Sequence, residues 1–210
     1  MHWRIAALLT TLVFTTPFAA RAEPIEGQDY VLVTGAPVTT GNEIEVMEFF
    51  YYGCEFCSRM EPHLDLWLKG LSPDIKFKRV PALRRTAWVP LTRVYFALEQ
   101  LGEIERLHAE VYYAVHDDGL NLGNSSELMK WAKRFGVDGP KLAELLDSDS
   151  VIMKVQRARD DTVAYSIRAT PSFVVDGRYM TSAGMTGSVD SLFAVIDGLI
   201  ERARVMRSAK

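Results

Sequence analysis

The only two cysteines of the 210-residue chain, Cys54 and Cys57, form one C-x-x-C motif directly after a run of β-forming residues. Residues 42–52 are β-branched and aromatic almost throughout, which is typical of a strand buried on both faces. From Phe56 onward the apolar residues follow helical spacing, and Gly70 ends that pattern. The motif therefore lies where a buried strand gives way to a helix.

The rest of the pattern predicts an α/β fold. Residues 75–80 alternate like a strand, and a strand–helix–strand connection of this length makes a parallel βαβ unit. A short edge strand is expected at 30–33, and residues 88–167 are helical in pattern almost throughout. Two strands then flank an Asp-Gly hairpin signal at Asp176, and an amphipathic helix closes the chain. The predicted order is β-β-α-β, a helical block, then β-β-α.

The N-terminal residues 1–22 are typical of a cleaved export signal. Arg4 supplies the positive charge, residues 5–14 are apolar, and Ala22 ends a small-x-small cleavage site. The alternative is an uncleaved anchor, but the apolar run is shorter than the ~20 residues that cross a bilayer. We expect one exported domain at 23–210. Because no linker rich in Pro, Gly or Ser flanks the helical block, we interpret residues 85–167 as an insertion into this domain.

The charge balance excludes some classes of partner. The chain has 24 Lys and Arg against 27 Asp and Glu, and removal of the signal leaves 22 against 27. This net negative charge gives no support to nucleic-acid binding, which is typical of a basic patch. It also gives no support to a polybasic membrane anchor.

Three interpretations of the C-x-x-C motif compete: a structural clip, half of a metal site and a redox pair. A disulfide that closes so short a loop stabilises by about 2 kcal/mol, against ~3 for a 15-residue loop, so a clip is badly placed. A structural zinc site is normally four-coordinate, and beyond His63 no second C-x-x-C or H-x₃₋₅-H follows. His108 and His116 fit ordinary surface or half-buried helical positions. We therefore favour redox chemistry and expect no metal and no cofactor.

Geometry assigns a role to each cysteine. The first amides of a helix have no intrahelical partner and carry partial positive charge, which stabilises a thiolate at Cys54 and lowers its pKa. Cys57 lies one helical turn further on, where it can bond to Cys54. We expect Cys54 to be the exposed nucleophile and Cys57 to resolve the mixed disulfide.

These features together resemble the thioredoxin-fold superfamily. The strand, the C-x-x-C motif and a helix with Pro62 inside it are similar to the thioredoxin fold. The export signal and the helical insertion before "ATPSFVVDGRY" resemble the DsbA-like family of periplasmic thiol:disulfide oxidoreductases. The resemblance covers essentially the whole mature chain and implies a periplasmic location.

The resemblance implies a substrate-binding turn at Thr170-Pro171. These residues match the family's cis-proline dipeptide, which packs against the active-site sulfurs. Cis X–Pro bonds are only ~5–6% of those in folded proteins, so the context must hold this one. Thr170 would then pair its backbone with an extended substrate. The alternative is an ordinary trans bond at a strand start.

The resemblance also implies a buried charge beneath the cysteines. Glu48 matches the family's buried acid, and Arg79 in the next strand aligns with the basic residue that partners it. An acid inside a central strand is costly unless it is paired or protonated. We expect Glu48 to manage the proton of Cys57 during exchange, and the alternative is a purely structural ion pair.

Three residues depart from the strongly oxidising members of the family, which have Pro-His between the cysteines. Here Glu55 adds negative charge near the thiolate, and Phe56 cannot donate to it. Thr170 also stands where the strongly oxidising members commonly have Val. All three changes predict a weaker oxidant than the Pro-His enzymes.

We expect a monomeric oxidase that donates the Cys54–Cys57 disulfide to exported polypeptides and is reoxidised by a quinone-linked membrane partner resembling DsbB. The alternatives are a reductase or isomerase of the same fold and a peptide-binding chaperone with no enzymatic role. Isomerases of this fold usually dimerise through an N-terminal domain, for which residues 23–41 are too short. A chaperone would not need two thiols.

Overall fold

The computed structural model describes residues 23–37 and 41–209, so the predicted export signal lies outside the described residues. The strands are β1 (Val31–Leu32), β2 (Ile44–Phe50), β3 (Ile75–Pro81), β4 (Ser172–Val175) and β5 (Tyr179–Ser182). The helices are α1 (Glu55–Lys69), α2 (Val89–Gln100), α3 (Ile104–His116), α4 (Ser125–Arg134), α5 (Gly139–Leu146), α6 (Asp149–Ala164), α7 (Ala183–Thr186) and α8 (Val189–Ser208). A 3₁₀ turn, η1 (Thr86–Trp88), precedes α2.

The strands form one mixed sheet in the order β1-β5-β4-β2-β3. β2 and β3 are parallel, while β4 lies antiparallel to β2 on its other side. Phe50 is paired with Pro81 of β3, and Phe49 with Ser172 of β4. The end of β2, the end of β3 and the start of β4 therefore meet at one edge of the sheet. The predicted α/β order is confirmed, with the short helix α7 as an addition.

Alternation along β2 separates two cores. Ile44 and Val46 pack in a cluster with Met60 of α1 and Leu199 of α8, so these two helices cover one face of the sheet. Met47 and Phe49 point to the opposite face and join a second cluster with α6 and the other helices between β3 and β4. Since side chains alternate along a strand, Glu48 belongs to the α1 face.

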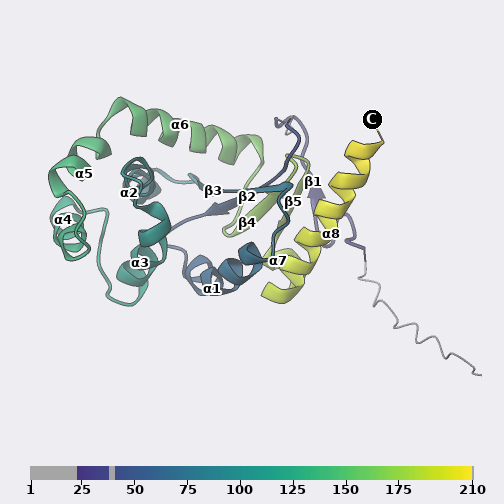
Figure 1. Cartoon of the computed structure of the whole chain (residues 1–210), viewed down its shortest axis with the longest axis horizontal. Coiled ribbons are helices and arrows are strands. Elements are labelled where there is room, and N and C mark those ends of the chain that lie inside the picture. Colours follow the sequence, from purple (N-terminus) through teal and green to yellow (C-terminus); the bar gives the residue numbers. More distant parts are fainter. Residues whose placement is uncertain (1–22, 38–40, 210) are drawn as a thin grey trace, which may run out of the picture.

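The helices α2 to α6 lie between β3 and β4, over residues 89–164, where the sequence placed a helical insertion. Figure 1 shows α2 to α5 gathered at one end of the molecule and α8 at the other, with α6 running back to the sheet. Asn124 caps α4, since its side-chain oxygen accepts hydrogen bonds from the backbone N–H groups of Ser126 and Glu127. The Asp-Gly hairpin is confirmed: Asp176 and Gly177 have φ of 55° and 66°.

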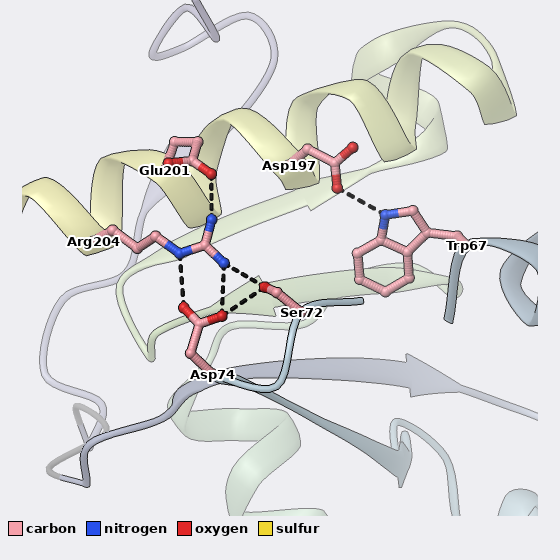
Figure 2. A network of polar contacts seen from close by, with 6 residues as sticks. All are labelled: Trp67, Ser72, Asp74, Asp197, Glu201 and Arg204. Atoms are coloured by element: carbon pink, nitrogen blue, oxygen red, sulfur yellow. Dashed lines mark hydrogen bonds and ion pairs between the residues drawn. The ribbon is translucent and has the colours of Figure 1, made fainter. Parts of the chain in front are cut away.

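Polar contacts fix α8 to the last turns of α1 and to the turn between α1 and β3 (Figure 2). Arg204 Nε donates to Asp74 Oδ2 at 2.7 Å, and its Nη2 donates to Ser72 Oγ at 2.6 Å. Hydrogen bonds from Arg204 hold the pKa of Asp74 well below its usual value. Trp67 Nε1 donates to Asp197 Oδ1 at 2.8 Å. A cleft of about 830 Å³ lies beside these contacts, at the end of α1 opposite to the cysteines.

Within residues 23–37 and 41–209, no helix combines the length and the apolar character that crossing a membrane requires.

Candidate active site

Cys54 is the N-cap residue of α1, with φ −94° and ψ 108°. Its Sγ accepts a hydrogen bond from the backbone N–H of Cys57 at 3.3 Å. The same sulfur lies 3.4 Å from the carbonyl oxygen of Thr170, to which its thiol donates. Both cysteines are free thiols; Cys54 is half-buried, while Cys57 is fully buried. The two sulfurs therefore differ sharply in their access to solvent.

The environment also separates the pKa values of the two thiols. A hydrogen bond from the Cys57 side chain, together with the backbone N–H groups of Cys57 and Phe56, lowers the pKa of Cys54 to about 6, although partial burial opposes this. Burial, reinforced by the Cys54 thiolate, raises the pKa of Cys57 well above its usual value. At neutral pH the reduced pair therefore holds a thiolate at Cys54 and a thiol at Cys57.

The segment before β4 forms the other wall of the site. The Thr170–Pro171 bond is cis, and Pro171 is buried. The antiparallel pairing of Ser172 with Phe49 brings this segment to the end of β2, beside Cys54. The backbone of half-buried Thr170 therefore lies against the sulfur of Cys54. The 3.4 Å contact between the Thr170 carbonyl oxygen and Cys54 Sγ joins two residues that are 116 positions apart in the sequence.

A buried charge cluster lies beneath Cys57, on the α1 face of the sheet. Glu48 has no exposed surface, and its Oε2 lies 3.5 Å from Nε of Arg79. Arg79 also forms ion pairs with Glu61 and, at 3.8 Å, with Asp65 of α1. Burial and the repulsion of Glu61 raise the pKa of Glu48 to about 8, and the attraction of Arg79 does not offset them. Glu48 is therefore mostly protonated at neutral pH.

Two members of this cluster were not identified from the sequence. Glu61 is 5% exposed and lies four residues after Cys57, so the helical period places both on one face of α1. His108 of α3, interpreted above as an ordinary surface or half-buried residue, is 5% exposed. Its Nδ1 lies 2.8 Å from the hydroxyl of Tyr52, and its Nε2 lies 3.6 Å from Oε1 of Glu61.

The residues between the cysteines point to solvent. Glu55 is exposed and lies 3.6 Å from Arg59, one helical turn further on. Phe56 is 38% exposed, and the Arg59 guanidinium lies 5.9 Å from the centre of its ring. Arg59 thus partly neutralises the charge that Glu55 places near the thiolate, whereas Phe56 supplies only its backbone N–H.

In the part of the chain that the structure describes, no group of three or more His, Cys, Asp and Glu side chains is arranged to hold a metal ion. The neighbours of Cys54 and Cys57 are instead hydrogen-bond donors, a backbone carbonyl and a buried acid–base cluster. This arrangement suits a thiol that attacks and leaves as a thiolate.

Comparisons with known proteins agree with this geometry. The model of the DSBA-like thioredoxin domain family matches residues 74–192. The thiol:disulfide interchange protein DsbA of Bordetella parapertussis is 36% identical over 195 residues, covering 92% of this chain and 93% of that protein. Its counterpart in Azotobacter vinelandii is 33% identical over 179 residues, covering 85% and 84%.

Solved structures show the same likeness. The crystal structure of Pseudomonas aeruginosa DsbA matches with a TM-score of 0.82 at 28% identity, over 87% of this chain and 95% of that one. The oxidoreductase DsbA from Xylella fastidiosa gives a TM-score of 0.82 at 28% identity, over 88% and 100%. The family model begins after the C-x-x-C motif, but an alignment of 195 of 210 residues must include it. The thioredoxin-like fold expected from the sequence is confirmed, and the chain belongs to the DSBA-like thioredoxin domain family of thiol:disulfide oxidoreductases.

Proposed function

We propose that the chain oxidises exported polypeptides through the Cys54–Cys57 disulfide. The observation that carries this proposal is the contrast between the two sulfurs. Cys54 is half-buried with a pKa of about 6, while Cys57 is buried with a raised pKa. A stabilised Cys54 thiolate is a good leaving group, and it favours the reduced form of the protein over that of its client. The disulfide is therefore donated rather than kept.

The proposed exchange has two steps. A client thiolate attacks Sγ of Cys54, the Cys54–Cys57 bond breaks, and Cys57 leaves as a thiolate that takes up a proton. A second client thiolate then attacks the client sulfur of the mixed disulfide and releases Cys54 as a thiolate. The client has lost two electrons and two thiol protons; the protein has gained the two electrons and one proton on Cys57, and the other proton passes to the solvent.

Glu48 is the proposed source of the proton for Cys57. Glu48 is protonated at neutral pH, and its negative charge, when present, raises the pKa of Cys57. Arg79 pairs with Glu48 and with Glu61 of α1. It also pairs with Asp65 of α1, which is more exposed to solvent than the two glutamates. Thr170 is the proposed site of backbone pairing with the client, since its carbonyl already lies 3.4 Å from the Cys54 sulfur.

A direct test mixes the oxidised protein with a reduced, unfolded secretory protein and follows the loss of free thiols. The wild-type protein should consume client thiols and end as the dithiol, while Cys54→Ala should be inactive. Cys57→Ala, loaded on Cys54 with a small disulfide, should accumulate a mixed disulfide with the client. Binding of the unfolded client that is unchanged in Cys54→Ala, without thiol loss in the wild type, would identify a chaperone instead.

A reductase of the same fold is the second candidate, because Glu55, Phe56 and Thr170 all reduce the expected oxidising strength. The pKa of about 6 for Cys54 is higher than the ~3.5 of the most oxidising site of this type. The thiol state of freshly exported protein, trapped with acid and alkylated, separates the two: mostly disulfide supports an oxidase and mostly dithiol a reductase.

The location and partners complete the proposal. Residues 1–22 act as a cleaved signal, and the mature domain works as a monomer in the periplasm. A quinone-linked membrane protein resembling DsbB restores the disulfide by passing two electrons from the dithiol to the quinone. N-terminal sequencing of the periplasmic form should begin at Glu23. Reoxidation of the reduced protein should depend on membranes that contain quinone.

A further inference from the structure

Three exposed arginines stand at the same edge of the sheet as Cys54. Arg84 and Arg85 lie in the turn between β3 and η1, and Arg168 lies two residues before Thr170. We call these three residues the arginine rim. Because the ends of β2 and β3 and the start of β4 meet at this edge, all three belong to the face that a client must approach.

The turn that carries Arg84 and Arg85 is fixed beside the nucleophile. At its start, Ala82 N donates to the carbonyl of Phe50 at 2.7 Å. At its end, the ring of Trp88 stacks on Tyr51 with 4.0 Å between centroids and 4° between planes. Tyr51 in turn accepts a hydrogen bond from the backbone N–H of Cys54 at 2.9 Å. The turn that carries the two arginines is thus linked to Phe50 and Tyr51, the residues that lead into Cys54.

Arg168 approaches from the other side. Leu83 N donates to Thr162 Oγ1 at 3.0 Å, which ties the same turn to the last helical turn of α6. The chain leaves α6 through Arg168 and reaches Thr170, whose carbonyl contacts Cys54. The arginine rim therefore borders the site along both segments that enclose it.

The cationic groups of the rim are available to a partner. Among the described residues, the side chains of Arg84, Arg85 and Arg168 form no hydrogen bond or ion pair, whereas Arg59 beside the motif is paired with Glu55. Residues 23–210 carry 22 basic against 27 acidic residues, so these three unpaired cations stand out in a chain that is negative as a whole. Charge of one sign at a binding site steers and selects ligands of the opposite sign.

We propose that the arginine rim selects unfolded polypeptides with Asp or Glu next to the reacting cysteine. The carboxylates pair with the rim, the stacked Tyr51–Trp88 pair and the exposed ring of Phe56 contact apolar parts of the client, and its sulfur reaches Cys54. This inference rests on the proposed exchange function and adds the substrate class to it. An anionic membrane surface is the other ligand that such charges could attract, but placement around the nucleophile favours the client.

The test uses three dithiol peptides that differ only in the residues flanking their cysteines: Asp, Ser or Lys. The oxidised protein is mixed with each peptide, and the rate constant of peptide oxidation is measured at low and at high salt. The readout is the ratio of the Asp rate to the Lys rate, which does not depend on the overall activity of a variant. Lys130→Gln, an exposed position on α4, removes the same charge away from the site and is the matched control.

The wild-type protein should favour the Asp peptide, and salt should reduce the ratio because exposed charges are screened. Each of Arg84→Gln, Arg85→Gln and Arg168→Gln should lower the ratio by about 1.4- to 5-fold, as expected for exposed ion pairs, while Lys130→Gln should keep it. Because three single variants are measured, the test still holds if one of them fails to fold.

A wild-type ratio of one, or an equal loss in Lys130→Gln, overturns the inference while leaving the exchange function intact. Oxidation of none of the three peptides contradicts the exchange function itself. Should the ratio be one while the protein co-sediments with phosphatidylglycerol vesicles only when the arginine rim is present, a membrane contact replaces the proposed client class.

Discussion

Removing the thiol of Cys57 should raise the pKa of Cys54, because a hydrogen bond from that thiol is the largest single cause of the low value. Cys57→Ala deletes this donor and keeps the backbone N–H that lies 3.3 Å from the Cys54 sulfur. Cys57→Ser deletes the redox partner equally but keeps a hydroxyl donor at the same position. The two variants therefore separate the side-chain hydrogen bond from the helix N-terminus.

The size of the effect follows from the strength of such a bond. Hydrogen bonds to charged groups contribute about 1.5–3 kcal/mol, and one pKa unit corresponds to about 1.4 kcal/mol. A thiol is a weak donor and Cys54 is partly open to water, so the lower end applies. We expect the pKa of Cys54 to rise by about one unit from its value of about 6 in Cys57→Ala, and to stay close to 6 in Cys57→Ser.

The assay is the rate of alkylation of Cys54 by iodoacetamide over a pH series that brackets this pKa, checked by the ultraviolet absorbance of the thiolate. Each variant contains a single cysteine, so the titration reports Cys54 alone. A wild-type value in Cys57→Ala refutes the reasoning, since the backbone amides would then account for the whole effect. An equal rise in both variants refutes it too, because the Ser variant keeps its donor.

Four further predictions concern the buried cluster and the motif. Glu48→Gln should move the alkylation profile of Cys57, measured in Cys54→Ala, to lower pH because a negative charge is lost; an unchanged profile supports a structural ion pair. Since burial raises the pKa of Glu48 from 4.5 to about 8, stability in urea should fall as pH rises through this window, and less so in Glu48→Gln. His108→Phe should lower the free energy of unfolding by about 1–3 kcal/mol, because the buried phenol and carboxylate that face it lose a partner; a wild-type urea midpoint would contradict this. Phe56→His should lower the pKa of Cys54 and make the protein more oxidising in a glutathione buffer, and an unchanged equilibrium would show that the third motif position does not set the potential.

Local patterns were enough to predict the framework of the site. A continuous β-forming run followed by helical spacing placed Cys54 at a helix start, and Asp-Gly placed the hairpin after β4. Such features depend on neighbours within a few residues, so the sequence contains the information directly.

The buried cluster could not be predicted in full, because its members come from separate elements. The contact between Tyr52 and His108 joins residues 56 positions apart, and it depends on how α3 packs against α1 and β2. The sequence also favoured the helix N-terminus as the main cause of the low Cys54 pKa. The structure adds a larger cause of the lowered pKa, a hydrogen bond from the Cys57 side chain.

Different groups surround Cys54 on its exposed side and on its buried side. On the exposed side, the arginine rim is proposed to select the client by charge without changing the energy of the sulfur. Inside, the Cys57 thiol and the protonated Glu48 decide which sulfur carries charge, and they lie where no client can reach them. Because exposed charges are screened and buried ones are not, salt should alter client preference and leave the balance between the two thiols unchanged. Variants of the arginine rim should therefore change client preference alone, while variants of Cys57 and Glu48 should change the pKa values of the thiols alone.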